Sequence, residues 1–313
     1  MSRPILVLGA SGFIGRQVTA ALAASGWATP IAAGRHLALG QSCLRLDITD
    51  EAALMRALDG VDDVVNCMAG APAAMARGCK TLFRAAEASG RPMIVHLSSM
   101  AVYGDVAGPV DETAAINDSQ GPYAAAKLVG ERLAASYPRS VVLRLGCVYG
   151  PESKQWSGRI ARLLRARRIG DLGAAGDGIA NLVYVGDVAQ AVLAALQTER
   201  AEGQAFNLAM AGAPTWNDYF LLFAKALGAV PITRLSERRI AFEARIMAPP
   251  LKIAEIAVRR LGLPADLVAP AIPPSLARLW RQEIILLPDK AEEILAMRWK
   301  PLAEGLAETA DHI

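Results

Sequence analysis

Short apolar runs alternate with helical stretches over the first two thirds of the chain. The apolar runs are continuous rather than alternating, as expected for strands that are buried on both faces. They occupy residues 5–9, 63–70, 93–99 and 140–146. Strands of this kind, separated by helices, are typical of parallel sheets with right-handed crossover connections. The pattern predicts an α/β protein with a doubly wound parallel sheet of the Rossmann type.

The alternation weakens after Gly150, which indicates a second part of the chain. A strand and helix pattern returns at 180–209, and from Trp216 the sequence is helical and interrupted by prolines. We therefore expect a dinucleotide-binding domain at 1–150, to which 180–209 returns. Residues 151–179 and 210–313 are expected to form a smaller, mostly helical C-terminal substrate-binding lobe.

Composition narrows the class of protein. The 313 residues are 53% hydrophobic, 20% charged and 5% aromatic, which excludes disorder, collagen and a disulfide scaffold. A net charge of +3 gives no global field for binding nucleic acid. Four cysteines without a CxxC pair and three histidines predict no metal site. Because no apolar run is long enough for a signal peptide or a membrane span, we expect a cytoplasmic enzyme.

A glycine-rich turn, GASGFIG, follows the first predicted strand and opens a helix. Glycines at this position allow a pyrophosphate to approach the backbone, and the amides at the helix N-terminus stabilise the anion. The alternative is a turn that needs glycine only for tight packing. We expect a dinucleotide to contact this turn and the end of a later strand, through Gly9, Ser11, Gly12, Phe13, Ile14, Gly15, Met68, Ala69 and Gly70.

The end of the second strand favours NADP over NAD as cofactor. An acidic side chain there would accept hydrogen bonds from the adenine ribose, but no acid occurs from Ala28 to Gln41. Arg35 and His36 are instead expected to bind a 2′-phosphate, since a guanidinium suits a phosphate dianion. Asp47 and the adjacent Ile48 are candidates for contacting adenine. For Asp47, an N-cap of the helix that begins near Glu51 is the alternative.

The sequence Tyr123-Ala-Ala-Ala-Lys127 is the strongest chemical signal. A spacing of four places both side chains on one face of a helix, where the ammonium can lower the pKa of the phenol. A tyrosine that titrates near ~10 in water then becomes usable as an acid or base near neutrality. The alternative is an ordinary pair of side chains on a helix surface. This alternative is less favoured because Ser99, at the end of a predicted strand, supplies a further hydroxyl group.

With these residues the chain resembles the extended short-chain dehydrogenase/reductase family, in its NAD(P)-dependent epimerase/dehydratase group. The family's motifs occur in its order, as GASGFIG, LDITD, SSMAVYG, YAAAK, LRLGCVYGP, NLVYVGDVA and MRWKPLAEGLAET. The resemblance implies that Ser99 hydrogen-bonds the reacting oxygen and that Tyr123 exchanges its proton. Lys127 would hold the nicotinamide ribose and tune Tyr123, while the nicotinamide gives or takes hydride.

Departures from the family's motifs narrow the chemistry. Family members that eliminate water carry an acidic pair after the catalytic hydroxyl residue, whereas this chain has Met100 and Ala101. We therefore expect no 4,6-dehydratase activity. Two contacts to nucleotide-sugar phosphates in the family correspond here to Cys147 and Ala180, which weakens such an assignment. The expected substrate-binding residues are Met100, Cys147, Arg159 and Arg162.

Two basic segments have competing interpretations. Five arginines between 159 and 168, three of them spaced by three residues, form either a phosphate clamp or a solvated basic face. Residues 232–262 contain seven basic and three acidic residues among apolar ones. We favour a lid or an oligomer contact there over a membrane-surface helix, because Pro249 and Pro250 should interrupt the helix.

The sequence thus predicts an NADP-dependent oxidoreductase or epimerase that transfers hydride at a sugar carbonyl or secondary alcohol. A nucleotide sugar is the expected substrate, with a 4-epimerase or 4-ketoreductase reaction and a homodimer as the expected assembly. Two alternatives remain open, which are a carbonyl reductase for a non-sugar substrate and an NADP-binding sensor without turnover. The sensor predicts a broken catalytic set, but Ser99, Tyr123 and Lys127 are all present.

Overall fold

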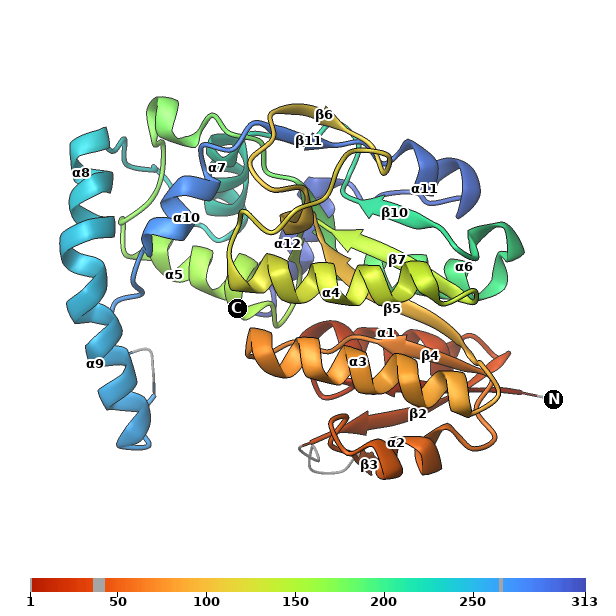
Figure 1. Cartoon of the computed structure of the whole chain (residues 1–313). Coiled ribbons are helices and arrows are strands. Elements are labelled where there is room, and N and C mark those ends of the chain that lie inside the picture. Colours follow the sequence, from red (N-terminus) through yellow and green to blue (C-terminus); the bar gives the residue numbers. More distant parts are fainter. Residues whose placement is uncertain (1, 36–42, 265–266) are drawn as a thin grey trace. The chain divides into compact units, whose positions relative to one another are not determined.

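The computed structural model describes residues 2–35, 43–264 and 267–313 (Figure 1). The chain forms two compact units, each made of three segments. Unit 1 contains Met1–Gly146, Val183–Ala211 and Leu286–Trp299, and unit 2 contains Cys147–Leu182, Gly212–Ile285 and Lys300–Ile313. Two short strands lie where the chain passes between the units, β9 (Leu182–Tyr184) and β11 (Ile284–Leu286).

Unit 1 is built on a seven-stranded sheet in the order β10-β7-β5-β4-β1-β2-β3. Every paired neighbour in this sheet is parallel. Its strands are β1 (Arg3–Leu8), β2 (Ala28–Gly34), β3 (Leu44–Arg45), β4 (Asp63–Asn66), β5 (Met93–Ser99), β7 (Ser140–Leu145) and β10 (Ala205–Leu208). The order reverses between β1 and β4, which confirms the doubly wound Rossmann sheet that the apolar runs predict.

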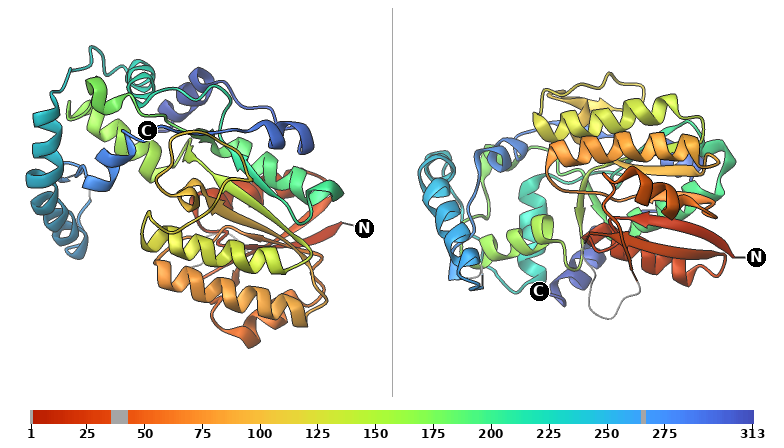
Figure 2. Two further views of the ribbon diagram at one scale, coloured as in Figure 1. Left: turned by 45° about the horizontal axis from the view of Figure 1, so that its top comes forward. Right: turned by 60° about the horizontal axis from the view of Figure 1, so that its bottom comes forward.

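Helices cover both faces of this sheet. Helices α3 and α4 lie side by side on one face, and α1 and α6 pack together on the other (Figure 2). The helices and turns of unit 1 are α1 (Phe13–Ala24), α2 (Glu51–Leu58), α3 (Pro72–Ala88), η1 (Met100–Tyr103), α4 (Pro122–Ser136), α6 (Val185–Gln197), η4 (Glu199–Ala201) and α11 (Asp289–Ile294). A short strand, β6 (Gly108–Val110), lies outside the large sheet.

The core of unit 1 explains why its strands are continuous apolar runs. Every residue of β4 and of β7 is buried, because helices cover both faces of the sheet. Leu82 and Phe83 of α3 pack in one cluster with Leu6, Val64 and Ile94 of three neighbouring strands. Burying such side chains stabilises the folded chain by about 1.5–3 kcal/mol each.

Unit 2 is mostly helical and has an aromatic core. The buried rings of Trp216, Tyr219, Phe220 and Phe223 lie on one helix, α7, and Trp280 packs edge-on against Phe220. The elements of unit 2 are β8 (Cys147–Tyr149), η2 (Lys154–Gly158), α5 (Arg159–Arg165), η3 (Gly173–Gly176), α7 (Trp216–Ala226), α8 (Glu237–Phe242), η5 (Glu243–Met247), α9 (Ala248–Arg260), α10 (Pro274–Leu279) and α12 (Leu302–Ala310).

The proline pair does not interrupt the helical segment of unit 2. Helix α8 continues through the π-helical turn η5 into α9, and the three form one rod (Figure 1). Pro249 and Pro250 fall in the first turn of α9. The amide of Ala248, directly before them, bonds the carbonyl oxygen of Glu243 five residues earlier, so the hydrogen-bond pattern changes where the prolines enter and the rod continues through them. The expectation that these prolines break the helix is therefore wrong.

The described ranges contain neither a membrane-spanning helix nor a cluster of metal-binding side chains. No helix among these residues is long and apolar enough to cross a membrane. Nor do three or more His, Cys, Asp or Glu side chains gather there in an arrangement able to hold a metal ion.

Candidate active site

The parallel register of unit 1 brings the predicted motifs to one edge of the sheet. Leu8, at the end of β1, is paired with Ala33 of β2 and with Asn66, the last residue of β4. Ser99 ends β5, opposite the last residue of β7. The carboxyl edge of a doubly wound sheet is where such proteins bind ligands. Four predicted features lie at this edge. The glycine-rich turn and the 67–70 segment follow β1 and β4, and β2 and β5 end there with Gly34 and Ser99.

The glycine-rich turn leaves no room for side chains. Gly9 has a φ of +78°, and a Cβ there would lie 3.0 Å from the carbonyl oxygen of Cys67. A Cβ on Gly15 would lie 2.2 Å from the carbonyl oxygen of Gly9. Gly12 caps α1 without a side-chain hydrogen bond, and the first turn contains no acid. The amides of Phe13 and Ile14 therefore have no intrahelical partner, and the turn fits a dinucleotide pyrophosphate.

Two predicted cofactor-binding residues, Ile48 and Met68, lie close together. A Cβ on Gly78 of α3 would meet Ile48 Cγ2 at 2.8 Å and Met68 Cε at 3.1 Å. Both side chains are half-buried and pack on the edge of the core cluster. Ala69 and Gly70 follow Met68 and are exposed, and Gly70 has a φ of +150°. This surface offers an apolar wall beside an open backbone.

The residues expected to select the cofactor lie at the end of β2 and after β3. Arg35 directly follows β2 and is exposed, whereas His36 lies outside the described residues. Asp47 accepts two hydrogen bonds from Thr49, which lower the pKa of its carboxyl below the ordinary range, helped by the nearby charge of Arg35. The N-cap of α2 is Asp50, whose side chain accepts from the amide of Ala53. The N-cap alternative for Asp47 is therefore wrong.

Tyr123 and Lys127 meet on one face of α4. Tyr123 is the second residue of this helix and is 44% exposed. Lys127 is buried one turn later, and its Nζ lies 5.9 Å from the centroid of the Tyr123 ring. Lys127 Nζ also donates a hydrogen bond of 2.6 Å to the carbonyl oxygen of Leu97. The exposed tyrosine thus has a fixed cation beneath it.

Burial lowers the pKa of Lys127 from its ordinary value. Cys79, Cys67 and, on the next turn of α4, Glu131 partly oppose this effect. Sequence reasoning missed Glu131, although its spacing of four from Lys127 places it on the same helix face. Cys67 directly follows β4, and Cys79 lies in α3. Both are far from Lys127 in sequence, so only the fold brings their thiols near it.

Ser99 ends β5 and caps the short turn η1. Its Oγ accepts a hydrogen bond of 3.3 Å from the amide of Ala101. An oxygen that accepts this bond keeps its own proton for another acceptor. Met100, the next residue and an expected substrate contact, is buried. Ser99 is the last residue of β5, and Leu97, which accepts the hydrogen bond from the Lys127 ammonium, lies two residues earlier in the same strand.

His96 is a core residue, as its position in a central strand predicts. It is buried in β5, and its Nδ1 accepts a hydrogen bond of 3.0 Å from Asn66 Nδ2 if the ring proton is on Nε2. A Cβ on Gly130 would lie 2.4 Å from His96 Nε2, so α4 needs glycine there. Burial, with the charge of Lys127 as the smaller cause, lowers the pKa of His96 to about 3.

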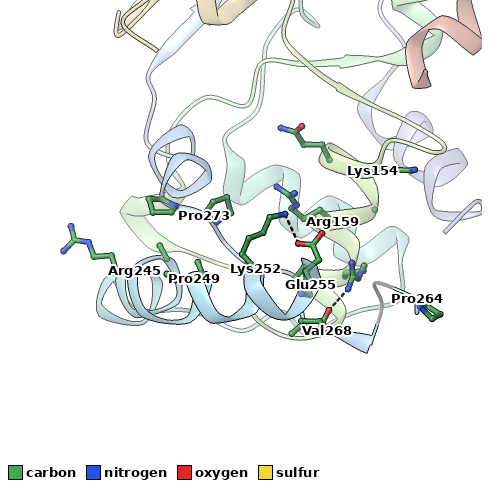
Figure 3. A pocket seen from close by; sticks show the side chains of 18 residues that line it. Lys154, Arg159, Arg245, Pro249, Lys252, Glu255, Pro264, Val268 and Pro273 are labelled. Atoms are coloured by element: carbon green, nitrogen blue, oxygen red, sulfur yellow. Dashed lines mark hydrogen bonds and ion pairs between the residues drawn. The ribbon is translucent and has the colours of Figure 1, made fainter. Parts of the chain in front are cut away.

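Within unit 2, the arginine segment divides between two environments. Arg159 and Arg162 line a cavity of about 1100 Å³, together with Lys154, Arg245, Lys252 and Glu255 (Figure 3). Arg162 also donates to the carbonyl oxygen of Val268 at 2.6 Å. Arg168 is instead held in an ion pair with buried Glu243. Arg159 and Arg162 thus form part of a cationic cavity, while Arg168 stabilises the fold of unit 2.

Cys147 and Ala180, which replace polar residues of the family's motifs, are buried in unit 2. The amide of Cys147 donates to the carbonyl oxygen of Asn181 at 2.6 Å, and burial raises the pKa of its thiol. Cys147 has no charge to offer a phosphate, because its thiol is neutral near pH 7 under these conditions.

Comparison with known proteins identifies similar sequences. Residues 5–209 match the profile of the NAD dependent epimerase/dehydratase family. The chain is 34% identical over 215 residues to a dTDP-4-dehydrorhamnose reductase of Mycobacterium tuberculosis, covering 62% of this chain and 66% of that protein. It is 30% identical over 210 residues to the reductase of the same name from Mycolicibacterium smegmatis, covering 62% and 60%. The chain thus spans less than two thirds of the length of these relatives.

Solved structures share the fold at lower identity. The UDP-glucuronic acid 4-epimerase of Bacillus cereus, in complex with UDP-glucuronic acid and NAD, has a TM-score of 0.74 at 20% identity. The UDP-glucose 4-epimerase of Thermotoga maritima, with UDP-glucose, has a TM-score of 0.74 at 22% identity. Both alignments cover 99% of this chain and 98% of the other.

Proposed function

The chain belongs to the NAD dependent epimerase/dehydratase family, and from this premise we propose that it transfers hydride between a nicotinamide cofactor and a sugar carbonyl or secondary alcohol. The observation that carries the proposal is the pairing of exposed Tyr123 with the buried ammonium of Lys127. Both lie in unit 1, whose sheet presents Ser99 and the glycine-rich turn at one edge.

Ser99, Tyr123 and Lys127 form the proposed catalytic trio, and each has a role that its environment supports. Tyr123 is exposed, so its hydroxyl can reach a substrate oxygen and exchange a proton with it. Lys127 places a positive charge under the ring, which favours the phenolate. The hydroxyl of Ser99 donates a hydrogen bond to the same substrate oxygen while accepting one from Ala101.

The cofactor supplies the hydride, and the glycine-rich turn would hold its pyrophosphate. A side chain at Gly9 would collide with the backbone of Cys67, and one at Gly15 with the backbone of Gly9, so only glycine allows this turn. Gly12, Phe13 and Ile14 would donate amides, with Ser11 beside them. Ile48, Met68, Ala69 and Gly70 would line the adenine side, and Asp47 would contact the adenine.

We propose NADP as the preferred form of the cofactor. Arg35 is exposed directly after β2, where an acid would favour NAD, and no acid occurs from Ala28 to Arg35. His36 is the second residue proposed to bind the 2′-phosphate. An arginine that binds a phosphate dianion gains a charge-assisted hydrogen bond that NAD does not offer.

The proposed substrate is a nucleotide sugar that reacts at C4. The relatives of at least 30% identity are named as reductases of a dTDP-linked 4-keto sugar, which favours a 4-ketoreductase over a 4-epimerase. Arg159 and Arg162, in the cationic cavity of unit 2, are the proposed phosphate contacts, with Cys147 and Met100 as further substrate contacts. Met100 and Ala101 cannot move a proton, so we propose no 4,6-dehydration.

The proposed function is tested with purified protein, NADPH or NADH, and a panel of UDP-, GDP-, CDP- and dTDP-linked sugars and 4-keto sugars. Oxidation of the reduced cofactor is followed by absorbance, and products are identified by mass spectrometry. We expect NADPH-dependent reduction of a 4-keto sugar that Tyr123→Phe abolishes. Loss of water from a hexose would contradict the proposed chemistry.

Two other outcomes would replace the proposal. Turnover of an uncharged ketone without binding of any nucleotide sugar would indicate a carbonyl reductase. Tight NADPH binding without turnover of any substrate class would indicate a sensor.

The cellular setting and assembly are proposals as well. We propose a cytoplasmic homodimer, with 1–150 and 180–209 as the dinucleotide-binding domain and 151–179 and 210–313 as the substrate lobe. Unpaired thiols at Cys79 and Cys147 fit a reducing compartment. Cross-linking and sedimentation of the full chain measure the assembly.

A further inference from the structure

An exposed apolar surface runs along the rod of unit 2 and the loop that follows it. Half of the fourteen large hydrophobic side chains that are exposed in the described ranges lie between 242 and 267. Leu261 is 74% exposed and Ile253 is 69% exposed. We name as the α9 surface the residues Phe242, Ile246, Ile253, Ile256, Leu261, Leu263 and Leu267. Exposed apolar side chains that are concentrated in one segment of a protein mark interaction sites.

The α9 surface is accompanied by positive charge that the fold does not neutralise. Residues 232–262 contain seven basic residues and three acids. Each of the three acids is already engaged, Glu237 with Arg281, Glu243 with Arg168 and Glu255 with Lys252.

Three arginines of the rod have no such neutraliser. Arg238, Arg245 and Arg260 are exposed, and within the described ranges no carboxylate forms an ion pair with any of them. An apolar surface bordered by unneutralised arginines complements an apolar partner with negative charge at its boundary.

The geometry of the rod separates two sides. Ala244, Arg245, Ala248, Lys252 and Glu255 line the cavity of unit 2, where Lys252 and Glu255 form an ion pair (Figure 3). No residue of the α9 surface lines that cavity. Because α8, η5 and α9 are continuous through the proline pair, one helical element carries Phe242, Ile246, Ile253 and Ile256. The sequence-based objection to an interfacial helix therefore falls away.

We propose that the α9 surface docks on a membrane containing anionic lipids, with the rod lying in the interface. The apolar side chains enter the boundary between head groups and acyl chains. Arg238 and Arg260 contact lipid phosphates. Interfacial helices bind by this combination of buried apolar area and attraction to anionic lipid. The proposal is independent of the proposed function, since it uses no residue of the trio or of the glycine-rich turn.

Charge favours this occupant over a second copy of the chain. Two α9 surfaces facing each other would bring two sets of unneutralised arginines together, and like charges at an interface oppose association. Anionic lipids remove the same repulsion and attract each arginine.

The test is co-sedimentation of the full chain with vesicles of phosphatidylcholine, with and without phosphatidylglycerol. Ile246→Ser/Ile253→Ser removes apolar contact, and Arg238→Gln/Arg260→Gln removes charge. Matched controls change other exposed residues outside the rod, Met55→Ser/Leu221→Ser and Arg56→Gln/Arg132→Gln. Circular dichroism checks that each variant is folded, and gel filtration of the same samples reports the oligomeric state.

We expect binding to vesicles with phosphatidylglycerol, at least about tenfold stronger than to phosphatidylcholine alone and weakened by salt. Each test pair should lower the apparent affinity by about tenfold or more, while the controls stay within about twofold. Equal binding to both vesicles, or equal effects of test and control pairs, would overturn the proposal. A dimer that Ile246→Ser/Ile253→Ser dissociates, without vesicle binding by the parent protein, would also overturn it and assign the surface to a second copy.

Discussion

The buried ring of His96 should make the stability of the folded chain fall at acid pH, and the titration of this single residue can be measured. Its ring is buried among Asn66, Gly130 and the ammonium of Lys127. Burial first, and the charge of Lys127 second, lower its pKa from 6.5 to about 3. The folded chain therefore keeps the ring neutral over the whole range between these values.

The direction of the effect follows from proton binding. Below pH 6.5 the unfolded chain protonates His96 and the folded chain does not, so stability present above 6.5 is lost as pH falls toward 3. Each pH unit of difference between the two pKa values corresponds to about 1.4 kcal/mol. Lowering the pH from about 7 to about 5 should cost about 2 kcal/mol through this residue alone.

The comparison that isolates this effect uses His96→Gln, which retains an acceptor for Asn66 and does not titrate. Urea unfolding of both proteins at the two pH values gives the pH-dependent loss, and the carboxylates common to both cancel in the difference. The loss should be smaller in the variant by about 2 kcal/mol. NMR of the ring signal that disappears in His96→Gln should show no titration above about pH 4. In Lys127→Met the pKa of His96 should rise but stay below 6.5, since burial is its larger cause. Equal pH dependence in both proteins, or titration of the His96 ring near its ordinary pKa, would refute the reasoning.

Three further predictions concern the cofactor and the reaction. Tyr123→Phe should lower kcat at least about 10²-fold with NADPH affinity unchanged, because one exposed hydroxyl is lost, and a variant with nearly full activity would exclude Tyr123 as the proton donor. Gly15→Ala should weaken NADPH binding about tenfold or more in a fluorescence titration, since its Cβ would lie 2.2 Å from Gly9 O. Gly26→Ala, which strains the backbone through a φ of +76° but lies beyond the end of α1, should leave NADPH binding unchanged. Arg35→Ala should lower the ratio of NADPH to NADH affinity about tenfold, with Arg56→Ala as control, and an unchanged ratio would assign the 2′-phosphate to other residues.

Much of the Rossmann architecture could be predicted from the sequence because buried parallel strands are apolar without interruption. The run at 93–99 coincides with β5, and the run at 140–146 contains β7. The expected helix beginning near Glu51 is α2. The rod of unit 2 could not be predicted because its continuity depends on backbone geometry. A π-helical turn directly precedes Pro249 and Pro250 within the rod, and no pattern of residue types signals such a turn.

The candidate site was predictable where its residues are close in sequence. The spacing of Tyr123 and Lys127 on one helix face appears in the structure because α4 is regular there. The acceptor of the Lys127 ammonium was not predictable, since Leu97 O belongs to another element and has no sequence signature. The burial of Arg168 against Glu243 was missed for the same reason, because the partners are 75 positions apart.

Arg144 shows how a buried charge can support the candidate site. It interrupts the apolar strand β7, and its guanidinium bonds Glu131 of α4 through Nε and a terminal nitrogen, the latter at 2.8 Å. Ser98 donates to the same carboxylate at 2.5 Å, and both charged side chains are buried. Breaking a buried pair of this kind leaves an uncompensated charge, which costs about 3–5 kcal/mol.

The position of this pair on α4 connects it with the proposed chemistry. Tyr123, Lys127 and Glu131 occupy successive turns of one helix face. The second turn is bonded to Leu97 and the third to Ser98, which are consecutive residues of β5 and directly precede Ser99. Two adjacent turns of the helix are thereby fixed to the strand that ends in the proposed catalytic serine. The first turn can then expose Tyr123 to solvent, while the two buried hydrogen bonds fix the position of Tyr123 relative to Ser99. Proton transfer at a catalytic site requires such rigid support.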